Sequence, residues 1–367
     1  YITNNIALFN IRYGDMEAFL RSKIDSILSP AEYAAFSQLT SFSELQTALG
    51  STHLGKCMTD IRETNINNLR QNLAEKLNDD ITEVQRESES DLYKFIDMIR
   101  HKYIIENVFL ILVRAVQSRV DAQNVKFNPM GMCEQLKTLT NAADEGVFRA
   151  VLESTPVSQY FQSADVDLDF FQQIQSKIDD RDQKNAFIQE LEICKQKVLK
   201  QYHKSFIRFC KYLGGETWEA MSKLLAFEMD MVTIMLRVNM LKTTAEGLPA
   251  ALYPEFGHLY PFVQDTFAGI SDYDSVVNAL SDYQEYKECL EQASQQNKSL
   301  LEMFKNKKEE YLKECMAMQF NFGCVYAYIQ MRESEAENVY MIVQGMVMAQ
   351  QDAARFQLRK QKRRVLK

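Results

Sequence analysis

The sequence predicts an all-α protein, because of its composition and because of a helical motif that it repeats. The chain has 367 residues and is 46% hydrophobic, with 22 Phe and 17 Tyr, so it can build a large core. Only 12 Gly and 6 Pro interrupt it, which is too few for a sandwich or a many-stranded sheet. The motif, residues 103–116 (YIIENVFLILVRAV), is apolar on nearly every face, as a helix inside a core is.

This motif is too short to cross a membrane. Its apolar run after Asn107 lasts about ten residues before Arg114 interrupts it, whereas a bilayer requires roughly 20. Similar stretches lie at residues 227–238 and 336–346, and in each copy a carboxylate and a further polar residue lead into an apolar run. We therefore predict three buried helices that belong to a threefold internal repeat.

Short helices are predicted at the start of the chain. The first covers residues 16–28, where apolar side chains recur at helical spacing, and it stops at Ser29, a plausible cap followed by a Pro at a first helical position. A second helix follows at residues 31–39. A third starts at Ser41, which stands at capping-box spacing from a Glu, and ends near Leu49. The region predicts a compact cluster of short helices.

The capped short helix also recurs, and its spacing from the buried motif defines the repeat. Its copies end at Leu49, Leu152 and Leu280. From that leucine to Asn107 or Asn338 the spacing is 58 residues in the first and third copies, and to Asp230 it is 78 in the second. The middle copy therefore carries about twenty extra residues, which we assign to the polar stretch 164–184.

Between these two motifs each copy has a long polar helix with a narrow apolar stripe, which predicts that one side is buried. In the first copy the stripe is Ile66, Leu69, Leu73, Leu77, Ile81 and Val84. The predicted organisation is three helical units at 1–116, 117–238 and 239–350, followed by a basic tail at 351–367. Three such units can pack side by side with pseudo-threefold symmetry or stack as a short solenoid.

The cysteines are typical of reduced thiols in a cytosolic compartment. There are seven, an odd number, with no CxxC pair and no accompanying His spacing, which argues against a disulfide framework or a zinc site. They are Cys57, Cys133, Cys194, Cys210, Cys289, Cys315 and Cys324. The sequence shows no signal peptide.

Charge is distributed unevenly along the chain. The net charge is −8, yet residues 355–367 carry only basic groups and no acid. The acidic remainder argues against a broad nucleic-acid surface. The basic tail is interpreted either as a solvated helix end or as a segment attracted to anionic lipid headgroups or to an acidic partner.

A search for chemistry finds no catalytic, cofactor or metal site. The four histidines are scattered, without HExxH or HxxxH spacing. Asp165 opens a stretch that looks like a calcium loop, but Phe170 stands where Gly is needed and Ser176 stands where a bidentate Glu is needed. The acids at 179–182 lack the DDxxD spacing that holds magnesium in prenyl-diphosphate enzymes. The sequence thus predicts a protein without catalytic activity.

Six polar residues in the three apolar motifs are the candidate functional residues, since such groups are costly in a core unless they are paired. They are Glu106, Asn107, Glu228, Asp230, Glu337 and Asn338. One interpretation is that they bond to helix ends and to Arg or Tyr neighbours inside each unit. The other is that they line a shared axial opening and meet a partner there.

The chain also resembles a known family, subunit d of the membrane (V0) sector of the vacuolar-type proton ATPase, which is related to the C subunit of archaeal and bacterial A-type rotary ATPases. The resemblance runs in family order from about residue 11 to 350. It is carried by YGDMEAFLR (13–21), LSPAEYAAFSQLTSFSELQTAL (28–49), FIRFCKYLGGETWEAM (206–221), LYPEFGHLYP (252–261), DYDSVVNALSDYQEYKECLE (272–291) and FNFGCVYAYIQMRESEAENVYMIVQGMVMAQ (320–350).

The resemblance implies a funnel of three similar helical bundles, seated as a peripheral protein on the cytosolic face of a vacuolar or endomembrane proteolipid c-ring. Its cavity would receive the central stalk made by the D and F subunits, with the a subunit of the V0 sector as a further candidate partner. It would bind no cofactor and no nucleic acid, and would couple stalk rotation to proton transport.

The chain departs from the family pattern at Met231 and Val232, where the family tends to have two Arg, at Asn321, where it usually has His, and in the basic end beyond Arg355. Two other functions compete with the adapter. One is a helical-repeat scaffold that binds proteins in a soluble complex, and the other is an all-α enzyme with an unrecognised site.

Overall fold

The protein is described by a computed structural model, which covers residues 6–117, 126–139, 145–166, 181–241, 251–267 and 269–365. These residues form helices and connecting turns, and no strand occurs among them. The all-α prediction is confirmed. The threefold internal repeat is not confirmed and stays a prediction.

The chain divides into two compact units, each assembled from segments that are distant in sequence. The larger unit comprises Tyr1–Gly14, Ser88–Phe127 and Gly131–Ala327, and the smaller unit comprises Asp15–Glu87, Asn128–Met130 and Tyr328–Lys367. Helix α1 (Ile6–Ile24), the turn η3 (Pro129–Gly131) and helix α18 (Gly323–Val365) each belong partly to both. The predicted division at 1–116, 117–238 and 239–350 is not tested by these units.

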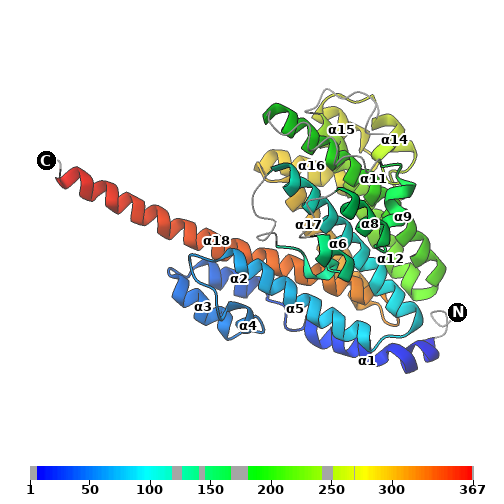
Figure 1. Cartoon of the computed structure of the whole chain (residues 1–367), viewed down its shortest axis with the longest axis horizontal. Helices are drawn as coiled ribbons and strands as arrows, with labels where there is room; N and C mark the ends of the chain where they lie inside the picture. The colour runs from blue at the N-terminus through cyan, green and yellow to red at the C-terminus, as the bar shows by residue number, and fades with distance from the viewer. Residues whose placement is uncertain are drawn as a thin grey trace. The chain divides into compact units, whose positions relative to one another are not determined.

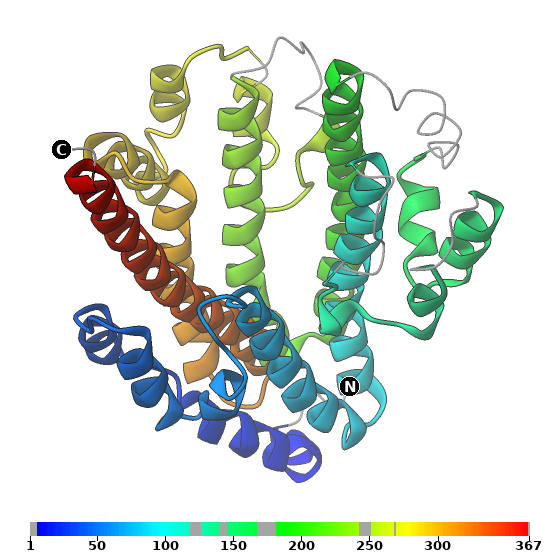
Figure 2. The same ribbon diagram turned by 60° about the vertical axis from the view of Figure 1, so that its left-hand side comes forward.

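The larger unit is built on three long helices. Helix α11 (Arg181–Leu213) packs against both α6 (Ser90–Gln117) and α12 (Gly215–Met240), as Figures 1 and 2 show. The shorter helices are α7 (Glu134–Leu139), α8 (Glu145–Ser154), α9 (Ser158–Ser163), α14 (Phe262–Phe267), α15 (Tyr273–Ala279), α16 (Gln284–Gln296) and α17 (Leu300–Ala317).

Two consecutive glycines let the chain reverse between α11 and α12. Gly214 has φ 64° and Gly215 has φ 51°, a region that residues with a Cβ rarely adopt. The left-handed turn ends α11 and starts α12 within one residue, so the two long helices pack against each other. The Gly-Gly pair therefore forms the tight connection between α11 and α12.

Aromatic rings fill the core of the larger unit. The rings of Tyr202 and Phe206 are nearly parallel, with centroids 5.8 Å apart, and Phe206 also contacts Phe95. Farther along α12, Phe227 is fully buried and stacks on Tyr311 at 4.8 Å. Such rings bury large areas in a fixed geometry, so this unit is closely packed.

The smaller unit contains the predicted cluster of short helices. The second and third predicted helices are α2 (Pro30–Ser37) and α3 (Phe42–Gly50), but the first differs from its prediction at 16–28, because α1 begins at Ile6 and ends at Ile24. Together with α4 (Gly55–Met58) and α5 (Asn67–Arg86), α2 and α3 pack with α18 around one hydrophobic core. The predicted cap at Ser29 is confirmed, because its side chain and that of Glu32 form a capping box. Ser41 also caps its helix, by accepting the N–H of Glu44.

The apolar stripe predicted for the first long helix is confirmed in α5. Leu69, Leu73, Leu77, Ile81 and Val84 are all buried. On the α18 side the same core includes Val339, Val343 and Val347, which recur at helical spacing.

Two predicted segments lie partly outside the described residues. Of the predicted insertion at 164–184, residues 167–180 lie outside them. The basic tail at 351–367 is helical as far as Val365, and its last two residues lie outside the described part of the chain.

Candidate functional site

Helix α12 carries two buried carboxylates, Glu228 and Asp230, which the sequence singled out. Asp230 is fully buried and Glu228 is 7% exposed. Residues two apart on a helix point in different directions, so each carboxylate has its own partners. Both lie in the larger unit, and both are held by segments that come much later in the sequence.

Asp230 fixes the turn that precedes α14. Its carboxylate accepts the backbone N–H of His258 at 2.8 Å and of Leu259 at 3.0 Å, and the hydroxyl of Tyr286 at 2.8 Å. Burial raises the pKa of Asp230 above its ordinary value, although these three donors oppose the shift. The bonds satisfy a carboxylate that would otherwise be costly to bury.

A glycine makes this arrangement possible. Gly257 has φ 115°, and a Cβ placed on it would lie 2.2 Å from Oδ1 of Asp230. No other residue type fits both the backbone conformation and the close approach of the carboxylate. The buried carboxylate of Asp230 and the conformation of Gly257 therefore determine the backbone of the turn at 257–259.

Glu228 joins three helices. Its carboxylate accepts the hydroxyl of Tyr326, from the start of α18, and pairs with the ammonium of Lys308 of α17, 2.7 Å from Oε1. Burial favours the neutral acid, but Lys308 and the hydroxyl outweigh it and hold the pKa of Glu228 below its ordinary value. Burial raises the pKa of Tyr326, so the hydroxyl stays protonated and donates.

The candidate residues of α6 lie in the same unit. Asn107 is buried at 2% exposure, and Glu106 is half-buried. Burial raises the pKa of Tyr202 most strongly, and the charges of Glu228 and Glu106 add to the rise. The fold therefore places Glu106 and Glu228 within electrostatic reach of one buried tyrosine.

The remaining two candidates, Glu337 and Asn338, are exposed on α18 in the smaller unit. Glu337 lines a groove of about 240 Å³ between α5 and α18, and Arg70 is also among its lining residues. Four of the six candidates thus belong to the larger unit and two to the smaller. A shared axial opening lined by all six stays a prediction.

Sequence reasoning missed a second buried charge network, which lies in the smaller unit and is centred on Arg332 and Glu335 of α18. Arg332 Nη1 donates to Glu335 Oε2 at 2.6 Å, and its Nη2 donates to the carbonyl of Lys23 at 2.6 Å and to Ser26 Oγ at 2.8 Å. Glu335 also accepts the N–H of Leu28 at 2.8 Å. The network ties α18 to the end of α1.

His53 completes this network. Its Nε2 lies 2.6 Å from Arg332 Nη1 and 3.1 Å from Glu335 Oε2. Nε2 therefore lies between a guanidinium group that can only donate and a carboxylate that can only accept. Burial acts to raise the pKa of Glu335, but the contacts with His53 and Arg332 hold this pKa below its ordinary value.

Asp80 of α5 extends the network. It accepts the hydroxyl of Tyr328 at 2.8 Å and pairs with Lys23 at 3.1 Å. The sequence offers one signal for the central pair, because Arg332 and Glu335 stand three residues apart, a spacing at which opposite charges meet on one face of a helix. The burial of Arg332 and Glu335 could not be predicted from the sequence, because it depends on how α1 and α5 pack against α18.

The sequence profile of one protein family, described as ATP synthase (C/AC39) subunit, matches residues 16–355. The chain belongs to this family. It is 29% identical over 342 residues to V-type proton ATPase subunit d1 of Arabidopsis thaliana, a match that covers 91% of this chain and 92% of the relative.

Two further relatives of this family member extend the comparison. It is 28% identical to V-type proton ATPase subunit d of Dictyostelium discoideum, over 92% of this chain and 91% of the relative. It is 26% identical to V-type proton ATPase subunit d of Saccharomyces cerevisiae, over 94% and 96%. The resemblance read from the sequence segments is confirmed.

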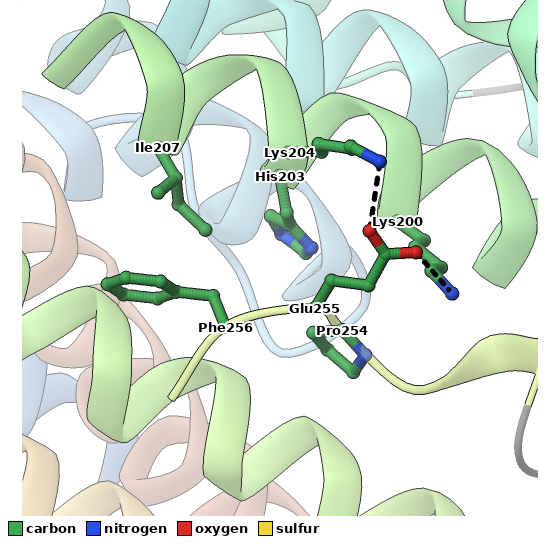
Figure 3. Close-up of a pocket in the computed structure, with 7 residues that line it drawn as sticks. All are labelled: Lys200, His203, Lys204, Ile207, Pro254, Glu255 and Phe256. Atoms are coloured by element: carbon green, nitrogen blue, oxygen red, sulfur yellow. Dashed lines mark hydrogen bonds and ion pairs between the residues drawn. The ribbon is translucent and has the colours of Figure 1, made fainter. Parts of the chain in front are cut away.

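This C/AC39 family member has a small cavity between α11 and the turn at 254–256. The cavity measures about 70 Å³, and in Figure 3 both Lys200 and Lys204 reach Glu255, at 3.3 and 2.9 Å. Burial, with a smaller effect of Lys102, lowers the pKa of His203 in its wall to about 4. The imidazole is therefore neutral near pH 7 and has no charge to offer a ligand.

The described residues hold no group of three or more His, Cys, Asp or Glu side chains placed to bind a metal ion. Across the same part of the chain, no helix combines the length and the apolarity that crossing a bilayer requires. The buried polar residues described above tie helices together.

Proposed function

We propose that this chain is the non-catalytic subunit d of a V-type proton ATPase and serves as the adapter between its rotating parts. The observation that carries the proposal is the similarity to subunits named V-type proton ATPase subunit d over more than nine-tenths of this chain. In this role the chain sits on the cytosolic face of the proteolipid c-ring and transmits the rotation of the central stalk to it.

The internal construction of each unit suits this task. Transmitting torque requires a body that does not yield, and closely packed interiors transmit strain. In the larger unit the buried Glu228 links α12 to α17 and to the start of α18. In the smaller unit Arg332 links α18 to the end of α1. Buried charge pairs of this kind fix one arrangement of helices, because leaving either member unpaired is costly.

The proposed partners are the proteolipids of the ring, the D and F subunits of the central stalk, and the a subunit of the membrane sector. Membrane contact is then indirect, through the complex. Among the six candidate residues, the exposed pair Glu337 and Asn338 is accessible to a partner in the described structure, whereas Asp230 is buried and fully engaged. We assign partner contact to the exposed pair.

Detergent extraction tests the proposal. Tagged full-length chain is purified from salt-washed membranes in a mild detergent, and the co-purified proteolipid is quantified. The adapter resists the salt wash and carries proteolipid in a fixed ratio. Recovery of the chain entirely in the soluble fraction, with no proteolipid, would favour the protein-binding scaffold instead.

A charge reversal tests the assignment of the exposed pair. Glu337→Lys should lower the amount of stalk or ring proteins recovered with the chain, while the helical circular dichroism remains. Glu302→Lys, on an exposed position of α17, is the matched control and should leave recovery unchanged. Equal recovery with both variants would remove Glu337 from the interface without touching the proposed function.

A further inference from the structure

The turn before α14 presents two exposed aromatic side chains on either side of Pro261. Phe262 is 80% exposed and Tyr260 is 43% exposed. Large apolar side chains exposed together on a surface are typical of interaction sites. We call Tyr260, Pro261, Phe262 and Asp265 the aromatic corner. It lies in the larger unit, where α14 packs against α15 (Figure 1).

Buried residues on the core side hold the aromatic corner in a fixed conformation. Leu259, Val263 and Phe267 alternate with its exposed residues and are buried in the core. The carboxylate of Asp230 holds the N–H of Leu259. Because its buried neighbours occupy the inward positions, Phe262 cannot turn into the core, and it is presented to solvent at little entropic cost of ordering on binding.

Two more bonds complete the support. The side-chain amide of Gln264 donates to the carbonyl of Pro254 at 2.8 Å, and the hydroxyl of Tyr283 donates to the carbonyl of His258 at 3.2 Å. These bonds connect the turn to itself and to the segment before α16. A preformed turn that exposes an aromatic ring has the character of an interface anchor.

The chain segment that contains the aromatic corner is acidic. Residues 251–286 contain six carboxylates and neither Lys nor Arg. Glu255 is engaged, because it pairs with both Lys200 and Lys204 of α11. Four other carboxylates are exposed on α14, at the start of α15 and in the segment before α16: Asp265, Asp272, Asp274 and Asp282.

We propose that the aromatic corner docks a basic segment of a protein partner, one in which Lys or Arg side chains flank an apolar side chain. Phe262 and Tyr260 supply the apolar and cation–π contacts, and the exposed carboxylates pair with the basic groups. The same carboxylates would repel the anionic headgroups of a membrane surface, so the observations favour a protein. The inference goes beyond the proposed function and does not depend on it.

Phe262→Ser is the decisive variant, because a side chain this exposed can be changed without disturbing the fold. The probe is a fluorescent amphipathic Lys/Leu helical peptide, and binding to the full-length chain is measured by anisotropy at low salt. We expect Phe262→Ser to weaken binding at least about 10-fold, as loss of an interface anchor does. We expect Asp265→Asn to weaken it by about 3-fold, with a smaller salt dependence than the parent chain.

Tyr212→Ser is the matched control, since Tyr212 is an aromatic side chain of α11 at 57% exposure, outside the corner. It should leave peptide binding unchanged. A Glu/Leu peptide of the same length and vesicles containing phosphatidylserine should not bind. Equal affinities of the Phe262→Ser and Tyr212→Ser variants for the Lys/Leu peptide would overturn the proposal. Binding to the vesicles that is lost in Phe262→Ser would replace the protein partner with a membrane.

Discussion

The hydroxyl of Tyr326 donates to Oε2 of Glu228 at 2.8 Å, with both side chains buried in the larger unit. One bond thereby connects the first turn of α18 to the middle of α12. Lys308 of α17 approaches the same carboxylate from another side. A buried carboxylate with one cationic and one hydroxyl partner holds three helices in a single arrangement, since moving any one of them exposes an unpaired charge.

Removing the phenol hydroxyl tests this bond directly. Tyr326→Phe deletes one donor and keeps the ring packing, so the free energy of unfolding should fall by about 1.5–3 kcal/mol, as for a hydrogen bond to a charged group. Urea unfolding followed by circular dichroism measures the loss. Tyr212→Phe, at an exposed tyrosine, should change it by less than about 0.5 kcal/mol. A Tyr326→Phe variant as stable as the control would contradict the bond's importance.

The ion pair should show strong coupling between its members. Lys308→Met removes the ammonium group that pairs with the buried Glu228 carboxylate, and we expect a loss of about 3–5 kcal/mol in the free energy of unfolding. Glu228→Gln in the Lys308→Met background removes the unpaired charge and should recover much of the loss. The measurement is a double-mutant cycle of unfolding free energies. Additive effects of the two substitutions would show that the pair does not interact.

Replacing two glycines of the same region with Ala should have different effects on stability. Gly257→Ala places a Cβ 2.2 Å from the Asp230 carboxylate at φ 115°, so it should destabilise the protein by about 2 kcal/mol or more. Gly269→Ala meets no atom within 4 Å and has no such backbone conformation, so it should be close to neutral. Thermal unfolding of the two variants compares them. Similar melting temperatures would show that the carboxylate does not constrain the turn.

Acid should destabilise the protein before its carboxylates titrate. The folded-state pKa of His203 is lowered from 6.5 to about 4, mainly by burial. Its contribution to stability is therefore fully present above pH 6.5 and is lost as the pH falls toward 4, up to about 3 kcal/mol. His203→Gln should flatten this part of the stability profile, measured by urea unfolding at several pH values. An unchanged slope between pH 6.5 and 4.5 would mean that His203 protonates in the folded state.

The carboxylates act in a lower window. Contacts with Lys308 and with Arg332 hold the pKa values of Glu228 and Glu335 below the ordinary value of 4.5. Groups with depressed folded-state pKa values stabilise the protein above their unfolded pKa and lose that effect as the pH falls further. The slope assigned to His203 is therefore separable from theirs.

Sequence reasoning reached the features that depend on local spacing. The buried stripe of α5, for example Leu69 and Leu73, follows from residues three and four apart. The cap at Ser29 follows from the residues that succeed it. Such patterns are complete within one element, so no tertiary information is needed to interpret them.

The partners of the candidate residues could not be predicted in this way. Asp230 is satisfied by the turn at 258–259 and by Tyr286, and Glu228 by Lys308 and Tyr326, all of them distant in the sequence. The division into two units is likewise made of discontinuous segments. Composition and periodicity describe an element and not its neighbours, so they do not determine which buried charge meets which donor.

The central claim is that this chain couples a rotating stalk to a proton-carrying ring. ATP-driven acidification of membrane vesicles from cells depleted of the chain tests it most directly. We expect that acidification is lost while the proteolipid ring stays in the membrane, and that expressing the full-length chain again restores it. Vesicles that lack the chain and still acidify at the normal rate would contradict the proposed coupling function.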